Sequence, residues 1–493
     1  MIKNQRKDIH HPAHIRNLPP TILTIFGATG DLAADYLLPA LLHMEEHRLL
    51  PADFKLACVG RRDLNAKSYF DFVVKKSSVL KKIPQAVKNR FFSRLIYYRA
   101  DFDSPASFAG LSRLLSLHDR PESDRCYNRL YYFATSPQYF AGIARMLKAE
   151  GLLTGCAEHK RQVRILVEKP FGFNLASARA LNSLLLKNFS EEQIYRIDHY
   201  QGKETVQNLM VVRFANSIFE PLWNKDHIDH VEISVLETDT AKLRAVYYDQ
   251  TGAIRDFVQN HVLQVLSLLT MDEPYELTAE NIRNEKNKIL KVLRPFTAGS
   301  LKTGLIKGQY VGYAREAGGE SRTETFVALK AFVDTPRWQG VPFYLRTGKA
   351  LHKKVAEVSV HFKEPARCIF KNCAANILTF RLQPDESVHL QLNNKIPGFG
   401  IELHQGDYEF GYKRAFASEI PGAYERLLLD FIEGDQRLFI RSDEIESSWK
   451  FIDSIIENPE FQKTPVHIYK PKTTGPAEAE AFIKKDLREW WTR

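Results

Sequence analysis

The sequence contains no long hydrophobic run. No stretch of about 18 apolar residues occurs in the 493-residue chain, so the sequence predicts no membrane-spanning helix and no membrane partner. Residues 1–20 are polar and basic and end in two prolines, without the apolar centre of a signal peptide. We therefore expect residues 1–19 to form a flexible N-terminal tail and the protein to be cytoplasmic.

Cysteine is also scarce. The five cysteines are odd in number and scattered along the chain. Only Cys368 and Cys373 lie close together, and their spacing matches no common zinc signature. The pattern predicts free thiols, which are typical of a reducing compartment.

Low-complexity stretches and internal repeats are absent as well. With 44% hydrophobic and 26% charged residues, the composition is that of a soluble globular protein with an ample core. The length fits two large domains or three of ordinary size.

The charge is basic, with 69 Lys and Arg against 59 Asp and Glu, a formal net charge of +10. Such an excess suits anionic partners. Because the basic residues are spread along the chain, a phosphorylated small ligand or a plain basic surface explains them better than nucleic acid does. We expect no nucleic-acid partner.

The first strand and turn are typical of a dinucleotide-binding fold. Residues 21–26 form a short β-rich apolar run that stops at Gly27, and a helical pattern follows. Glycine lets the backbone approach a pyrophosphate, and the helix N-terminus supplies N–H donors. The motif is G-x-x-G-x-x-A rather than G-x-G-x-x-G, so a tight turn without a ligand remains an alternative. The candidate coenzyme-binding residues are Gly27, Ala28, Thr29, Gly30, Asp31 and Leu32.

The second strand, residues 55–60, ends at Arg61 and Arg62. An acidic residue at this position would bind the ribose hydroxyls of NAD, whereas arginine suits the 2′-phosphate of NADP. An exposed pair in a loop is the alternative. The sequence therefore favours NADP as the cofactor.

Strands at 128–134 and 163–167, with a helical stretch near 138–150 between them, extend a doubly wound, mostly parallel sheet. The second half is different, with alternating strands at 228–237, 356–362, 378–382 and 388–392. We predict an α/β Rossmann dinucleotide-binding domain over 20–198. A large α+β domain with a mainly antiparallel sheet follows over 199–493, and it serves substrate binding and oligomerisation.

Two smaller features complete the organisation. An uncovered face of the large sheet predicts a homo-oligomer interface. After Thr474-Gly475-Pro476 we expect a final helix that reaches Trp490 and Trp491.

His43, Glu46 and His47 fit the H-x-x-E-H pattern of some zinc peptidases. They fall at the end of the first predicted helix, and no third ligand is suggested nearby. We interpret them as surface residues and expect no metal.

The block at 196–204 is dense in groups that bind phosphate. His199, Tyr200 and Lys203 can each donate a hydrogen bond, and Gly202 permits a helix to begin there. A basic cluster at a helix N-terminus is typical of an anion site, although a capped surface helix would look similar.

This block, RIDHYQGKE, resembles the substrate-binding signature of glucose-6-phosphate dehydrogenases. The segments GATGDLA, FATSP and EKPFG resemble the coenzyme-domain motifs of that family, and Gln259-Asn260-His261 resembles the segment that carries its catalytic base. Residues 346–351 resemble a second substrate-binding segment, and 423–428 with Trp449 match the C-terminal region. The matches run in family order from about residue 20 to residue 490.

The resemblance implies oxidation of glucose 6-phosphate at C1 with hydride transfer to NADP. The products are 6-phosphogluconolactone and NADPH, in the first step of the oxidative pentose phosphate pathway, by a homodimer or homotetramer. His261 would be the general base and Asp198 its partner, and we expect the carboxylate to raise the pKa of that histidine. No metal is needed.

The resemblance also implies a set of substrate-binding residues. They are Lys169, His199, Tyr200, Lys203, Glu237, Asp256, Lys349 and Lys354. Lys169 would contact the coenzyme as well, and a cis peptide bond before Pro170 would aim both residues at the cleft between domains.

The chain departs from the family in the first helix, where lysines are usual and this sequence has Ala34, Asp35 and Tyr36. We expect this helix to make no side-chain contact with phosphate. The departure motivates an alternative function, a nucleotide-binding sensor with reduced turnover. A broader sugar dehydrogenase, accepting unphosphorylated glucose or galactose 6-phosphate, is another.

Overall fold

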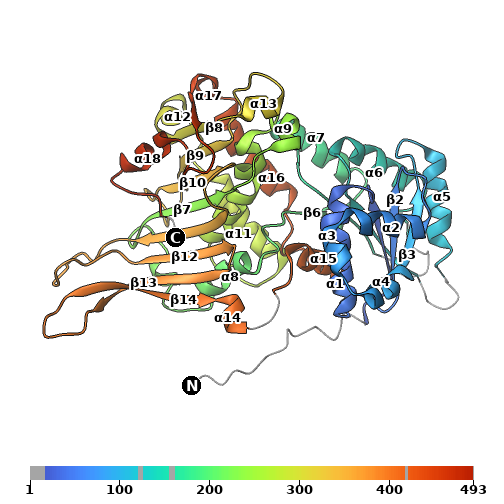
Figure 1. Ribbon diagram of the computed structural model, residues 1–493, viewed down its shortest axis with the longest axis horizontal. Coiled ribbons are helices and arrows are strands. Elements are labelled where there is room, and N and C mark those ends of the chain that lie inside the picture. The colour runs from blue at the N-terminus through green and yellow to red at the C-terminus, as the bar shows by residue number, and fades with distance from the viewer. Residues whose placement is uncertain (1–16, 120–125, 155–161, 417–419, 492–493) are drawn as a thin grey trace.

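The computed structural model describes residues 17–119, 126–154, 162–416 and 420–491. Two β-sheets dominate it, one formed by residues 21–196 and one by the rest of the chain (Figure 1). Long helices of the second part lie between the two sheets in this view.

The first sheet has six strands in the order β3-β2-β1-β4-β5-β6, and every neighbouring pair is parallel. This is the doubly wound order of a dinucleotide-binding fold, with its topological switch between β1 and β4. All residues of β1 and β4 are buried because helices cover both faces. The strands are β1 (Thr21–Phe26), β2 (Phe54–Gly60), β3 (Leu95–Arg99), β4 (Asn128–Phe133), β5 (Val163–Val167) and β6 (Ile194–Arg196).

The connections around this sheet are helical. A π-helical turn, η2 (Ala33–Leu37), opens the first of them and continues into α1 (Leu38–Glu46). The others are α2 (Ala66–Lys76), α3 (Ser78–Lys82), α4 (Gln85–Phe92), α5 (Pro105–Ser116), the 3₁₀ turn η4 (Pro137–Tyr139), α6 (Phe140–Ala149), α7 (Leu175–Leu186) and the 3₁₀ turn η5 (Glu191–Gln193).

The second sheet has nine strands in the order β14-β13-β12-β11-β7-β10-β9-β8-β15. Only the pairs β7–β10 and β8–β15 are parallel, so the predicted mainly antiparallel sheet is confirmed. Its strands are β7 (Ile228–Leu236), β8 (Leu305–Tyr310), β9 (Phe326–Ala331), β10 (Phe343–Gly348), β11 (Val355–Phe362), β12 (Ile377–Gln383), β13 (Ser387–Lys395), β14 (Leu403–Gly411) and β15 (Val466–Tyr469).

The two faces of this sheet differ in chemistry. Val231, Ile233 and Val235 of β7 join an apolar core with α10 (Leu263–Thr270) and α16 (Ser442–Ile456), whereas the alternate positions include His230 and Glu232. Successive side chains of a strand point to opposite faces, so one face is apolar and the other polar. The helices therefore cover the apolar face.

The second part contains these helices: α8 (Glu204–Phe214), η6 (Glu220–Leu222), η7 (Lys242–Arg244), α9 (Ala245–Tyr248), the π-helix η8 (Ile254–Val262), α10 (Leu263–Thr270), α11 (Ala279–Lys291), α12 (Ala298–Gly304), α13 (Tyr313–Ala317), α14 (Tyr412–Phe416), α15 (Ala423–Glu433), α16 (Ser442–Ile456), α17 (Pro459–Lys463) and α18 (Ala477–Lys484). None of the helices in the described residues is long and apolar enough to cross a membrane.

One of these helices packs away from its neighbours in sequence. The apolar face of α15, with Leu427, Leu428 and Phe431, belongs to the hydrophobic core of the first sheet. The ring of Phe431 lies 5.0 Å from that of Tyr195 on β6. The C-terminal part of the chain thus supplies one wall of the coenzyme-binding fold.

The prediction of free thiols at Cys368 and Cys373 is wrong. The two residues form a disulfide, with Cα atoms 5.9 Å apart, because the loop between β11 and β12 turns back on itself. Cys126 is disulfide-bonded too, and among the described cysteines only Cys58 is free and buried. The cysteine pattern therefore gives no support to a reducing compartment.

The final helix is shorter than expected. α18 ends at Lys484, and Leu487 adopts a left-handed conformation with φ 60°, which a helix cannot continue through. The chain from Arg488 to Trp491 then crosses the polar face of the large sheet, where Trp491 N donates to Glu232.

Candidate active site

Two buried residues form the centre of the site. His261 lies on the π-helix η8, and Asp198 follows the carboxyl end of β6. His261 Nδ1 lies 2.5 Å from Asp198 Oδ1, and both side chains are almost wholly buried. Asp198 Oδ1 also accepts a hydrogen bond from Tyr200 N at 2.9 Å. The carboxylate therefore holds the imidazole with its Nε2 directed away from Asp198.

The expected rise in the pKa of His261 is wrong. Burial lowers this pKa, and the ammonium of Lys169 lowers it further, so the carboxylate of Asp198 does not restore the ordinary value. Burial alone would raise the pKa of Asp198, but the charge and hydrogen bond of His261 hold it well below its usual range. At neutral pH the pair is thus an ionised carboxylate and a neutral imidazole.

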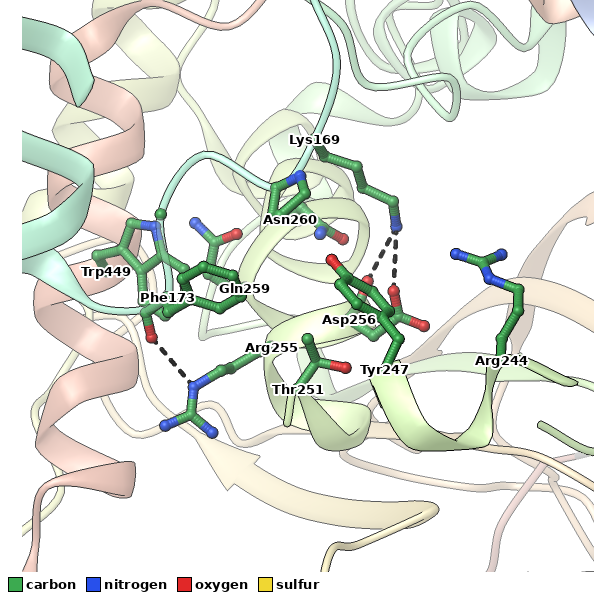
Figure 2. Close-up of a pocket in the computed structure, with 12 residues that line it drawn as sticks. Lys169, Phe173, Arg244, Tyr247, Thr251, Arg255, Asp256, Gln259, Asn260 and Trp449 are labelled. Atoms are coloured by element: carbon green, nitrogen blue, oxygen red, sulfur yellow. Dashed lines mark hydrogen bonds and ion pairs between the residues drawn. The ribbon is translucent and has the colours of Figure 1, made fainter. Parts of the chain in front are cut away.

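Lys169 completes this centre from the end of β5. The Lys169–Pro170 peptide bond is cis, as expected. Its Nζ lies 2.9 Å from His261 Nε2, 3.1 Å from the carbonyl oxygen of Asp256 and 3.5 Å from its carboxylate. Figure 2 shows Lys169 reaching down to Asp256 from the loop above η8. Of the two ring nitrogens of His261, Nδ1 thus contacts Asp198 and Nε2 contacts the ammonium of Lys169.

A small cavity adjoins Lys169 and Asp256 (Figure 2). Its volume is about 60 Å³, enough for a few water molecules but well below the ~300–1,000 Å³ of small-molecule sites. It is lined by Lys169, Pro170, Gly172, Phe173, Arg244, Tyr247, Thr251, Arg255, Asp256, Gln259, Asn260 and Trp449. The cavity adjoins the site but is too small to hold a sugar phosphate.

Two of the predicted phosphate-binding residues pack directly against His261. The rings of His199 and Tyr200 are centred 4.5 and 4.4 Å from the His261 ring. Lys203, the residue before α8, lies over Tyr200 at 5.3 Å. Burial lowers the pKa of Lys203, and the charge of Lys354 contributes to the same effect. The carboxylate of Glu386 acts in the opposite direction on Lys203, and a role of Lys203 and Lys354 in binding phosphate stays a prediction.

Glu237 and Lys349 form an ion pair of 2.6 Å at the ends of β7 and β10. The ammonium of Lys349 lies 5.6 Å from the Phe257 ring centre, and that of Lys169 lies 5.4 Å from the same ring. The structure thus brings Glu237, Lys349, Asp256 and Lys169 around one side of η8. Their contacts with a sugar stay predictions.

The coenzyme loop lies at the carboxyl end of β1. Gly27 has φ 86°, and a Cβ atom there would lie 2.4 Å from the carbonyl oxygen of Ala134, so only glycine fits. Arg61 lies over the Tyr139 ring at 5.9 Å and Arg62 over Phe72 at 4.9 Å. The glycine turn after β1 and the guanidinium groups of Arg61 and Arg62 after β2 suit a dinucleotide that carries a 2′-phosphate.

The first helix carries no cation where the family has lysines. Ala34 is buried, and Tyr36 is 55% exposed with its ring 5.5 Å from that of Tyr424. Tyr424 in turn stacks on His199 at 6.3 Å. Tyr36, Tyr424 and His199 therefore form a row of aromatic rings beside this helix, in place of the lysines that the resemblance leads us to expect.

Several residues of the site escaped the sequence analysis. Gln383 accepts a hydrogen bond from Lys203 Nζ at 2.8 Å, yet it lies 180 residues away without a motif. Lys76, the last residue of α2, forms an ion pair of 2.6 Å with Asp31 of the coenzyme loop. Burial raises the pKa of Glu168 to about 7 where Tyr132 donates to it at 2.6 Å. Of these residues only Glu168 could have been found from the sequence, because it is the first residue of the EKPFG segment.

The histidines of the H-x-x-E-H pattern have other partners. His43 Nδ1 lies 2.8 Å from Glu425, and the His43 and His47 rings are 4.2 Å apart. His43 and His47 are partly exposed and Glu46 is exposed, which agrees with their interpretation as surface residues.

Two family models match this chain, one over the part with the first sheet and one over the part with the second. Residues 24–208 match the family model for the glucose-6-phosphate dehydrogenase NAD-binding domain, and residues 210–491 match that for its C-terminal domain. The chain belongs to the glucose-6-phosphate dehydrogenase family. The predicted family, the fold class and the enzyme class, an oxidoreductase with an NAD(P)-binding domain, are thereby confirmed.

Individual members are similar over their full length. The glucose-6-phosphate 1-dehydrogenase of Rhizobium meliloti is 41% identical over 490 residues, covering 96% of this chain and 97% of the relative. That of Chlamydia pneumoniae is 40% identical and covers 96% of each. A solved glucose-6-phosphate dehydrogenase in complex with its substrate, glucose 6-phosphate, has a TM-score of 0.87 and 32% identity, covering 96% of this chain and 99% of the other.

Proposed function

We propose that this member of the glucose-6-phosphate dehydrogenase family oxidises glucose 6-phosphate at C1 with NADP, giving 6-phosphogluconolactone and NADPH. The observation that carries the proposal is the buried Asp198–His261 pair, with Lys169, His199 and Tyr200 packed around His261. The related structure bound to glucose 6-phosphate supports the choice of substrate. Neither a sensor nor a broader sugar dehydrogenase is favoured by these relatives.

His261 Nε2 takes the proton of the C1 hydroxyl after that hydroxyl displaces Lys169 from its present contact. Asp198 keeps the ring oriented and stabilises the imidazolium that forms. The electron pair of the breaking C1–H bond leaves as hydride while the C1–O bond becomes a carbonyl. NADP, when bound, accepts that hydride.

The remaining residues bind and orient. We infer that His199, Tyr200, Lys203 and Lys354 hold the 6-phosphate, because donors and positive charge gather there. Glu237, Asp256 and Lys349 contact the sugar hydroxyls, and Lys169 serves both substrate and coenzyme. The loop of Gly27, Ala28, Thr29, Gly30, Asp31 and Leu32 holds the pyrophosphate.

The organisation of the chain is also a proposal. Residues 20–198 form the coenzyme domain and 199–493 the substrate and oligomerisation domain, with α15 packing across the boundary. Of the proposed tail 1–19, residues 1–16 lie outside the described residues. We propose a homodimer or homotetramer formed through the large sheet, and a cytoplasmic location.

The direct test is to mix the purified protein with glucose 6-phosphate and NADP and to follow NADPH absorbance. We expect turnover that needs both compounds. Tight NADP binding without turnover of any sugar phosphate would instead support the sensor.

The acid limb of the pH profile should report His261. Its pKa lies below the ordinary 6.5, and only the neutral imidazole accepts a proton. kcat/KM should therefore be near its maximum at neutral pH and fall as the pH drops through the lowered pKa. Because a phosphate ester also titrates near pH ~6, the profile is repeated with unphosphorylated glucose. An acid limb above pH 6.5 with both substrates would identify a different base.

Coenzyme choice should depend on Arg61. Arg61→Ala is expected to lower kcat/KM for NADP by about 10–100-fold, the range of a charge-assisted contact of ~1.5–3 kcal/mol, and to change that for NAD much less. Steady-state kinetics with both coenzymes measure the ratio. The control is Arg90→Ala on α4, whose guanidinium pairs with Glu45. Equal losses with both coenzymes would place the 2′-phosphate elsewhere.

A further inference from the structure

The coenzyme loop receives a cation from α2, although no motif in the sequence indicates it. Lys76, the last residue of α2, donates from Nζ to the carbonyl oxygen of Thr29 at 3.3 Å and pairs with the Asp31 carboxylate at 2.6 Å. Thr29 and Asp31 both belong to the loop after β1. Lys76 thus brings a positive charge to a loop whose own helix has Ala34 and Tyr36 where the resemblance leads us to expect lysines.

The contact lies beside the end of β2, where the 2′-phosphate of a coenzyme would bind. The Thr29 side chain packs against Gly60, the last residue of β2, so closely that a Cβ atom at Gly60 would lie 3.2 Å from Thr29 Cγ2. Arg61 follows Gly60 directly. Because the ribose that carries the 2′-phosphate binds near the end of the second strand in such folds, Lys76 lies on that side of the loop.

One aromatic ring connects this lysine with the second arginine. The Lys76 ammonium lies 5.9 Å from the centre of the Phe72 ring, and the Arg62 guanidinium carbon lies 4.9 Å from the same centre. Phe72 and Lys76 are four residues apart on α2, so they share one face of that helix. Two cationic groups therefore contact one ring just beyond β2, and a phosphate placed there would be attracted by both.

Hydrogen bonds hold α2 against the loop. The buried Tyr69 hydroxyl on α2 donates to the carbonyl oxygen of Ala28 at 2.9 Å. The Tyr69 ring stacks on that of Tyr97 at 4.8 Å, and the Tyr97 hydroxyl donates to the carbonyl oxygen of Arg62 at 2.8 Å. These contacts join α2, the loop after β1 and the backbone of Arg62. The backbone of Lys76 therefore has a fixed position relative to both the loop and the arginine.

The ion pair with Asp31 does not prevent Lys76 from binding a phosphate. The Asp31 side chain is 85% exposed and that of Lys76 is 30% exposed, so water and salt screen their attraction. An exposed pair of this kind contributes little to stability, whereas a phosphate monoester offers close to two negative charges and three acceptor oxygens. The ammonium can therefore leave the carboxylate for the phosphate.

We propose that Lys76 binds the 2′-phosphate of NADP beside the arginines that follow β2, and so supplies from α2 a cation that the first helix lacks. The inference rests on the proposed use of NADP, and it names a further residue that selects this coenzyme over NAD. Because NAD has only hydroxyl groups on that ribose, the ammonium favours NADP alone.

Calorimetric titration of the full-length protein with NADP and with NAD, without any sugar, tests the role of Lys76. Lys76→Gln should weaken NADP binding by about tenfold, the lower end of the range for a charge-assisted contact, and change NAD binding less than about twofold. Lys76→Arg keeps the charge and should recover most of the loss. Lys75→Gln removes the same charge from the exposed neighbouring residue and is the matched control, with NADP binding expected to match the wild type.

Adenosine 2′-monophosphate is the second probe, because it carries the 2′-phosphate without a pyrophosphate. Its binding should weaken in Lys76→Gln by the same factor as that of NADP. Equal losses for NADP and NAD, with unchanged binding of adenosine 2′-monophosphate, would place the ammonium at the pyrophosphate and overturn the assignment. NADP binding that is equal in wild type and Lys76→Gln refutes the role of Lys76 but leaves the proposed function intact. A wild type that binds no NADP overturns both.

Discussion

Replacing His261 by asparagine lowers kcat for glucose 6-phosphate oxidation by about 10²–10⁴-fold, the contribution of a positioned general base. Asparagine keeps a polar side chain near Asp198 but offers no nitrogen that accepts a proton. The C1 hydroxyl must then lose its proton to water while hydride leaves. KM should change little, because His261 acts on the reacting hydroxyl rather than on the phosphate. Steady-state kinetics and a separate NADP-binding measurement check both parts.

His47→Asn is the control for this variant. His47 is partly buried and its Nδ1 bonds the carbonyl oxygen of His43, outside the site, so activity should be unchanged. A loss below about fivefold in His261→Asn would show that another residue is the base. A variant that binds neither coenzyme nor substrate would signal misfolding, since the buried Asp198 loses its 2.5 Å hydrogen bond to His261 Nδ1.

The second large effect is expected on kcat/KM when unphosphorylated glucose replaces glucose 6-phosphate. Three donors, His199, Tyr200 and Lys203, each contribute on the order of 1.5–3 kcal/mol in a hydrogen bond to a charged group. kcat/KM for glucose should therefore be about 10³-fold or more below that for glucose 6-phosphate. Similar values for the two sugars would support the broader sugar dehydrogenase.

Lys203→Gln locates this discrimination in the chain. Glutamine can still contact Gln383 but carries no charge, so the ratio of the two kcat/KM values should shrink by about 10–100-fold. The value for glucose itself should stay nearly constant. Lys302→Gln, a solvent-exposed lysine paired with Glu460, is the matched control. An unchanged ratio in Lys203→Gln would remove this lysine from the phosphate site.

The sequence was most informative where function depends on short segments. The strand at 21–26, the turn at Gly27 and the arginines after the second strand follow from local patterns, and all lie as predicted. The pairing of Asp198 with His261 came from the family resemblance, because no local pattern joins residues 63 positions apart.

Other features depend on tertiary contacts that no local pattern encodes. Gln383 reaches Lys203 only because β12 lies beside α8, and the π-helical form of η8 is not visible in its apolar spacing. The sign of the His261 pKa shift was wrong because the sequence shows a carboxylate partner but not the depth of burial or the position of Lys169. The disulfide at Cys368 depends on a loop that turns back on itself.

The position of α15 has a consequence for how the chain is made. Its residues Leu427, Leu428, Phe431 and Ile432, with Leu438 and Phe439 just after the helix, complete a core whose other buried members lie before residue 200. During synthesis the coenzyme domain therefore emerges with an apolar surface uncovered, and it remains so until more than 200 further residues have followed. Exposed surface of this kind attracts chaperones and promotes aggregation. The first domain to leave the ribosome is thus among the last to finish folding.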